Sequence, residues 1–254
     1  MKKDFPIGFF DSGVGGLSVY SQFKKVLPYE NTIYFGDLKN LPYGNKSKDE
    51  LVVITKNILD FFKTKNVKAV VIACNTSSAL AYEQIKDCYD FEIFPIIQSC
   101  AKIISQNNYK KLGIFATEGT VKSEAYKNEI QKYNPNIEIK EIACHNWVSI
   151  VEGFYPNKCE DIVKHLDEML SFSPDKIILG CTHYPYLLND LAKYVDKNIF
   201  VDPAEIFIEY LKNNIIRNDE KVEPTEEFYV SANPNMFIKN AKLFYKLKKT
   251  PILY

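Results

Sequence analysis

Short apolar stretches alternate with longer amphipathic stretches along most of this 254-residue chain. The apolar stretches are continuous rather than alternating in polarity, which is typical of parallel strands covered by helices on both faces. Strands are predicted at 6–10, 32–35, 67–73, 92–96, 110–116, 137–143, 175–180, 198–201 and 227–230. Helices are predicted at 17–27, 49–64, 77–86, 97–107, 120–133, 158–171, 187–194 and 235–248. This order of elements predicts an α/β fold built on parallel sheets.

An internal repeat divides the chain into two related halves. The segment 67–80, VKAVVIACNTSSAL, aligns with 174–187, PDKIILGCTHYPYL, and pairs Cys74 with Cys181, which lies 107 residues further on. We therefore expect two pseudo-symmetric parallel-sheet α/β domains that enclose an active-site cleft. The chain after about residue 208 is placed back on the first half. The predicted first domain is 1–97 plus 208–254, and the predicted second domain is 98–207.

Composition and charge exclude several classes of protein. The chain is 46% hydrophobic and 25% charged, values typical of globular proteins, so a wholly disordered or fibrous protein is excluded. Lysine plus arginine and aspartate plus glutamate both number 32, so a general nucleic-acid-binding surface is not expected. An apolar run of about 18 residues is lacking, so no association with a membrane is expected. Asp4 and Pro6 interrupt the N-terminal segment, which predicts a cytoplasmic protein without a signal peptide.

Two of the six cysteines occupy equivalent places in the repeat. Cys74 and Cys181 each follow a predicted strand directly. Ligands of open α/β sheets bind at this end of the strands, and the amides of a following helix favour a thiolate there. One such cysteine could equally be a small packing residue, but two at equivalent positions favour function. The cysteines lack CxxC spacing, so free thiols and no metal site are expected.

Short polar side chains follow both thiols. Asn75 and Thr76 come after Cys74, and Thr182 and His183 come after Cys181. These residues could cap helices, or they could bind a carboxylate or an amino acid together with helix amides. The second role gains weight because Arg217 is the only arginine, so the usual bidentate carboxylate clamp is scarce. His183 could also tune the thiol or transfer a proton.

The segment FDSGVGGLS, residues 10–18, is another strand-end candidate. It lacks the lysine of a P-loop and the spacing of GxGxxG, so a nucleotide site is poorly supported. Asp11 could be a helix cap, but we favour a base that holds a thiol or an ammonium group, because it would share the strand-end rim with Cys74. Residues 41–47, LPYGNKS, form either an ordinary turn or a loop that closes on a ligand.

The remaining candidates carry weaker signals. Glu152 is an isolated acid in an apolar stretch and on this ground alone is more typical of a surface residue. No role in the chemistry is assigned to His145 and His165. The cysteines that lack a repeat partner or a strand-end position are interpreted as structural, namely Cys88, Cys100, Cys144 and Cys159.

One thiol on each side of a ligand suits proton removal from one face of a carbon and delivery to the other. A Cys–His hydrolase uses one thiol with a paired base, and a dithiol redox enzyme needs adjacent thiols. A two-base proton exchange at a stereocentre matches the symmetry of the repeat. It requires one thiolate and one thiol at any moment. No cofactor motif is present, so polar groups alone would stabilise the carbanion.

The segments FDSGVGGL, YFGDLKNLPYG, ACNTSSAL, VKSEAY, VEG and LGCTHYP resemble, in this order, the glutamate racemases of the aspartate/glutamate racemase family. The resemblance implies a cofactor-independent, homodimeric enzyme that interconverts L- and D-glutamate and supplies D-glutamate for peptidoglycan synthesis. It implies that Cys74 acts toward D-glutamate with help from Asp11. It likewise implies that Cys181 acts toward L-glutamate with help from Glu152 and His183. The substrate contacts implied are Asp11, Ser12, Tyr43, Gly44, Asn75, Thr76, Thr182 and His183.

Two other functions stay open at this point. One is a racemase of aspartate or another acidic amino acid, although FDSGVGGL and PYG resemble the glutamate branch. The other is a non-catalytic, amino-acid-binding regulatory protein, against which the paired thiols argue. The residues His145 and Asn146 stand where the family commonly has proline nearby, and such departures put regulation and oligomer contacts in doubt rather than the chemistry.

Overall fold

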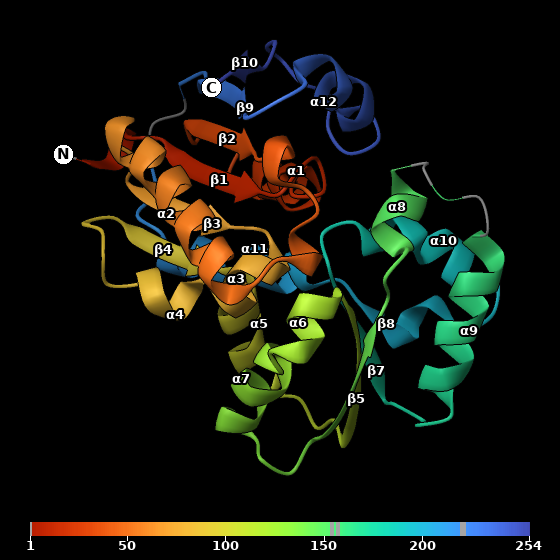
Figure 1. Ribbon diagram of the computed structural model, residues 1–254. Helices are drawn as coiled ribbons and strands as arrows, with labels where there is room; N and C mark the ends of the chain where they lie inside the picture. The colour runs from red at the N-terminus through yellow and green to blue at the C-terminus, as the bar shows by residue number, and fades with distance from the viewer. Residues whose placement is uncertain (1, 153–154, 156–157, 219–221) are drawn as a thin grey trace.

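The computed structural model describes residues 2–152, 155, 158–218 and 222–254, and its described strands form two sheets (Figure 1). Every strand pair in both sheets is parallel. Sheet A has the order β10 (Ile252–Leu253), β9 (Glu226–Val230), β2 (Thr32–Gly36), β1 (Ile7–Asp11), β3 (Ala69–Ile72) and β4 (Glu92–Pro95). Sheet B has the order β6 (Glu138–Ala143), β5 (Lys111–Ala116), β7 (Lys176–Gly180) and β8 (Phe200–Val201). The predicted class, two parallel-sheet α/β units, is confirmed.

Helices cover both faces of each sheet. They are α1 (Leu17–Val26), α2 (Lys48–Thr64), α3 (Asn75–Leu80), α4 (Tyr82–Ile85), α5 (Ile96–Ile104), α6 (Glu118–Lys122), α7 (Ala125–Tyr133), α8 (Trp147–Val151), α9 (Lys158–Leu170), α10 (Leu188–Leu191), α11 (Pro203–Asn214) and α12 (Pro234–Ala241). Helix α11 packs against α1 and α5, and α5 packs against α7. These four helices form a layer whose buried side chains join those of both sheets in one core cluster.

The central strand β1 shows why continuous apolar runs belong to covered strands. All five of its residues are buried. Successive side chains of a strand point to opposite faces, so Phe9 and Phe10 enter different cores. Phe9 packs on Tyr20 and Phe23 of α1, whereas Phe10 joins the cluster around α2. A polar residue at either position would be buried without a partner.

Several elements differ from those predicted. The helix expected at 77–86 begins at Asn75, directly after Cys74, and is divided into α3 and α4. The helix expected at 120–133 is interrupted at Glu124, whose φ is 51°. The helix expected at 235–248 ends at Ala241. The elements α8, α11 and β10 were not predicted.

The domain boundaries fall inside helices. The strands of sheet A come from 7–95 and 226–253, and those of sheet B from 111–201. The boundary at 97/98 cuts α5, and the boundary at 207/208 cuts α11, two helices that pack on each other. The exact division therefore stays a prediction. Within the described part of the chain, no helix is long and apolar enough to cross a membrane.

One partly buried carboxylate on the edge strand β6 makes stability depend on pH. Burial and the nearby charge of Glu124 raise the pKa of Glu141 to about 7, against the opposing effect of Lys127. The folded state then binds more protons than the unfolded state between about pH 4.5 and 7. The free energy of unfolding must therefore fall as the pH rises through this window.

Glu141→Gln should remove this fall in the free energy of unfolding with rising pH. We expect the variant to be about 1 kcal/mol more stable than the parent at pH 8, since partial exposure screens the charge, and equally stable at pH 4.5. Urea unfolding at the two pH values measures the difference. Glu138→Gln, at an exposed position of the same strand, is the control. An equal gain at both pH values would contradict the assignment.

Candidate active site

A cavity of about 170 Å³ lies where the carboxyl ends of the two sheets face each other. Cys74 and Cys181 both line it, one from each sheet. The predicted residues Ser12, Tyr43, Gly44, Asn75, Thr76, Thr182 and His183 line it as well. Asp11 is fully buried beside the cavity wall, and Glu152 contacts the far side of the His183 ring. The structure thus brings together all the residues that the sequence put forward for the site.

Cys74 lies between β3 and α3, where its surroundings favour the protonated thiol. The thiol is only 5% exposed and occupies the N-cap position of α3. Burial and the negative charge of Asp11 raise the pKa of Cys74 to about 12, although the backbone amide of Ser77 opposes this. At neutral pH Cys74 is therefore a thiol, able to donate a proton.

Cys181 follows β7 and has a different neighbour. Its Sγ lies 3.9 Å from Nδ1 of His183, and Nε2 of His183 lies 3.0 Å from Oε1 of Glu152. Burial alone would lower the pKa of His183. The contacts with Cys181 and Glu152, and the charge of Asp11, outweigh it and raise the pKa to about 10. An imidazolium at neutral pH can stabilise a thiolate on Cys181.

Asp11, at the end of β1, connects the two thiol environments. Its Oδ2 accepts a hydrogen bond of 3.1 Å from the Gly13 amide, and its Oδ1 accepts one of 3.4 Å from Thr182 of the other half. Burial raises the pKa of Asp11, and the charge of His183 lowers it. Its carboxylate therefore acts on Cys74 from one side and on His183 from the other.

Direct hydrogen bonds between the two halves hold the strand ends together. The Tyr126 hydroxyl donates to Oδ1 of Asn75 at 2.7 Å, and the hydroxyls of Thr76 and Thr117 are 2.9 Å apart. These bonds orient the two polar residues that follow Cys74. In addition, Ser18 donates to the backbone oxygen of Thr182 at 3.1 Å.

The loop around Tyr43 forms part of the cavity wall and is held in place by hydrogen bonds. Tyr43 is 2% exposed, and its hydroxyl donates to Oδ2 of Asp37 at 2.6 Å. Oδ1 of the same carboxylate accepts from Ser231, which follows β9, at 2.6 Å. Gly44 lies against Thr117 of the second half, where a Cβ atom would come within 3.2 Å of the Thr117 Cβ.

Cys144 and His145, which the sequence left without a role in the chemistry, both line the cavity. They follow β6 directly, so the signal that found Cys74 and Cys181, a polar residue after a strand, was present there too. Nδ1 of His145 lies 3.4 Å from Oε2 of Glu118, which begins α6 after the neighbouring strand β5. Ser149 of α8 is a further lining residue that the sequence did not indicate.

The other cysteines and His165 lie away from the cavity lining. Cys88 and Cys159 are exposed, so they do not serve as packing residues, while Cys100 is buried. His165 is buried on α9, and its Nδ1 lies 2.8 Å from the backbone oxygen of Asp161. Gly153, the last residue of the VEG segment, lies outside the described residues.

Residues 8–211 match the model of the Asp/Glu/Hydantoin racemase family. The chain belongs to this racemase family. It is 37% identical to a glutamate racemase of Thermoanaerobacter sp. (strain X514), with 98% of this chain and 96% of that one covered. It is 40% identical to glutamate racemase 2 of Caldanaerobacter subterraneus subsp. tengcongensis, with 94% and 92% covered.

Solved structures agree with this membership of the racemase family. The crystal structure of glutamate racemase from Francisella tularensis subsp. tularensis SCHU S4, in complex with D-glutamate, superposes with a TM-score of 0.90 at 30% identity. The superposition covers 99% of this chain and 98% of that one. A Picrophilus torridus aspartate racemase, 15% identical with a TM-score of 0.61, shares the fold.

Gly15 is a position beside the cavity where the backbone of this racemase leaves no room for a side chain. A Cβ atom there would lie 2.5 Å from Nδ1 of His183 and 2.5 Å from Oγ1 of Thr182. We expect Gly15→Ala to destabilise the fold by about 1–3 kcal/mol. Because it displaces His183 from Cys181, it should also lower kcat/KM for racemisation by roughly a hundredfold.

Gly13→Ala is the matched control, because a Cβ there meets only the two methyl groups of Leu41, at 3.4 and 3.9 Å. Urea unfolding and a racemisation assay on both variants separate the two effects. Equal losses for Gly15→Ala and Gly13→Ala would show that the contact with His183 is unimportant.

Proposed function

We propose that this chain interconverts L- and D-glutamate without a cofactor, by proton transfer at Cα between Cys74 and Cys181. The observation that carries the proposal is the pair of thiols at equivalent strand ends, β3 and β7, on the wall of one cavity. The relatives with glutamate racemase names, at 37% and 40% identity over nearly the whole chain, support glutamate as the substrate.

In the direction from L- to D-glutamate, Cys181 is the base. Its thiolate, stabilised by the His183 imidazolium, removes the Cα proton, and the bond electrons pass to the carbanion. Cys74, held as a thiol by burial and by Asp11, donates its proton to the other face of Cα. In the reverse direction the roles exchange. Asp11 then assists Cys74, while Glu152 and His183 assist Cys181.

Neutral donors replace a guanidinium clamp in holding the substrate. We propose that Ser12, Asn75, Thr76 and Thr182, together with the backbone near Gly44, bind the amino acid, and that Asp11, Tyr43 and His183 complete the site. All of these except Asp11 line the cavity. Fixed dipoles of this kind also stabilise the negative charge that develops on the substrate in the transition state.

Removing either thiol should abolish racemisation. For the parent protein in D₂O without added cofactor, we expect optical rotation to decay and deuterium to enter Cα from either enantiomer. Cys74→Ala and Cys181→Ala should each lower kcat by roughly a thousandfold or more, since a missing acid or base has no substitute. Polarimetry and NMR of the Cα–H signal measure both effects.

Cys88→Ala, at an exposed thiol, is the control and should behave as the parent. A normal rate for Cys74→Ala would refute the two-thiol mechanism. A parallel run with aspartate tests the alternative substrate. Binding of glutamate without any deuterium exchange would instead favour the regulatory binding protein.

The wider setting follows from the same family resemblance. We propose a cytoplasmic homodimer whose D-glutamate enters peptidoglycan synthesis. We also propose that 1–97 plus 208–254 and 98–207 act as its two domains. Sedimentation equilibrium at micromolar concentration should give twice the chain mass of 29.3 kDa. A measured mass equal to that of a single chain at micromolar concentration would rule out the dimer.

A further inference from the structure

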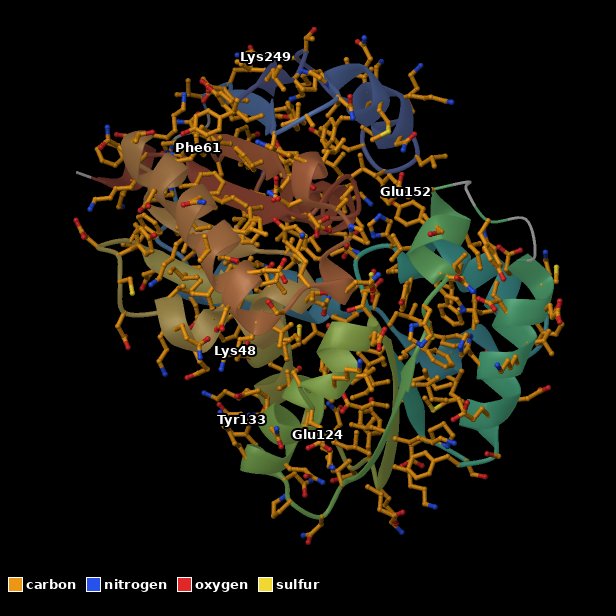
Figure 2. All side chains as sticks on the ribbon, in the orientation of Figure 1. Lys48, Phe61, Glu124, Tyr133, Glu152 and Lys249 are labelled. Carbon is orange, nitrogen blue, oxygen red and sulfur yellow. The ribbon has the colours of Figure 1, made fainter. Side chains whose placement is uncertain are left out.

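The C-terminal helix α12 reaches the acid/base group of the opposite half. It follows β9 of sheet A, yet its Asn240 Nδ2 donates a hydrogen bond to Oε2 of Glu152 at the end of α8. Figure 2 shows Glu152 at the end of α8 that lies beside the C-terminal segment. This contact joins positions 88 residues apart in the sequence and lies outside the internal repeat.

The bond to Asn240 leaves Glu152 with one oxygen for His183. Oε1 of Glu152 lies 3.0 Å from Nε2 of His183, and Nδ1 of the same ring faces Sγ of Cys181 at 3.9 Å. Three side chains therefore stand in line behind Cys181. Phe244, three residues after α12, closes the same side, with its ring centroid 6.0 Å from that of His183 in an edge-on arrangement.

The charged groups that face His183 come from three elements. They are Glu152 after α8, Asp11 on β1 and the thiol of Cys181 after β7. Its uncharged neighbours include Phe244, Gly15 and Thr182, whose Oγ1 lies 3.5 Å from Nδ1 of His183. A neutral amide at 240 fixes the Glu152 carboxylate without offering it a competing cation. One oxygen of Glu152 thus contacts Asn240 and the other contacts His183.

We infer that Asn240 is a positioning residue for the Cys181 half of the reaction, acting through Glu152 and His183. This inference rests on the proposed function. Cys74 has different neighbours, Asp11 and the Ser77 amide, so Asn240 should have little influence on it. The two proton transfers would then depend unequally on one residue far from the substrate.

Steady-state rates alone do not reveal this inequality. L- and D-glutamate are mirror images, so their equilibrium constant is one and kcat/KM must stay equal in the two directions. Primary isotope effects do distinguish the steps. If transfer at Cys181 slows, deprotonation of L-[2-²H]glutamate becomes more rate-limiting and its isotope effect rises. Deprotonation of D-[2-²H]glutamate by Cys74 becomes less rate-limiting, and its isotope effect falls.

Asn240→Leu removes the donor at nearly constant volume. We expect kcat to fall roughly tenfold, the size of effect that follows from losing one hydrogen bond to a charged group. The primary isotope effect should rise for L-[2-²H]glutamate and fall for D-[2-²H]glutamate. Asn240→Gln keeps the amide and should retain most of the activity. If residue 240 served only for packing, Asn240→Leu would instead be the more active of the two variants. Asn235→Ala, at an exposed position of α12, should match the parent.

A second measurement does not depend on turnover. Iodoacetamide alkylation at neutral pH, resolved by peptide mass spectrometry, compares the two thiols in one sample. Asn240→Leu should slow alkylation of Cys181 several-fold relative to Cys74, because a less firmly held imidazolium stabilises the thiolate less.

Unchanged isotope effects together with unchanged relative alkylation would overturn the inference. Equal slowing of both thiols would also overturn it, since it would indicate general loosening. If the parent protein does not racemise glutamate, the proposed function fails. In that case selective slowing at Cys181 would still establish the positioning contact, and its absence would exclude it.

Discussion

The carboxyl ends of β3 and β7 face one cavity, and the proposed chemistry depends on keeping their two thiols on the wall of that cavity. Parallel strands place all their carboxyl ends at one edge of a sheet, so each half contributes a rim of polar residues. The layer of α1, α5, α7 and α11 connects the two sheets through a common core. Hydrogen bonds such as those from Tyr126 to Asn75 and from Ser18 to Thr182 then fix the rims relative to each other.

The two thiols are equivalent in backbone position but not in charge environment. Cys74 lies near the Asp11 carboxylate, which with burial raises its pKa to about 12. Cys181 lies beside His183, whose pKa is raised to about 10. A proton exchange between two faces needs one thiol and one thiolate. In the proposed mechanism, the unequal neighbours of the two thiols would provide this difference, which the symmetry of the repeat cannot.

The C-terminal segment after β9 supports both sides of the cavity. Ser231 donates to Asp37, which holds the Tyr43 hydroxyl, and Asn240 donates to Glu152, which holds His183. Each contact acts on a wall residue through one intermediate carboxylate. A segment that takes no part in the internal repeat therefore orients groups on both repeats.

The sequence by itself determined the parallel α/β class, because strands covered on both faces must be continuously apolar. It also predicted that Cys74 and Cys181 share one site, because the repeat places both after a strand, and both line the same cavity. The start of α11 was readable as well, since Asp202 accepts from the Ala204 amide as an N-cap and Pro203 follows it. The predicted helices nevertheless do not include α11.

The family resemblance implied helpers for both thiols, but only the tertiary structure decided through which contacts these residues reach them. The contact of Glu152 with His183 and that of Asn240 with Glu152 join segments from α8, from the end of β7 and from α12. No periodicity or spacing encodes such contacts, because they depend on how separately formed elements pack. The place of His145 on the cavity wall has the same origin. Local patterns record burial and strand ends, whereas the partners of a buried charge are chosen by packing across the whole chain.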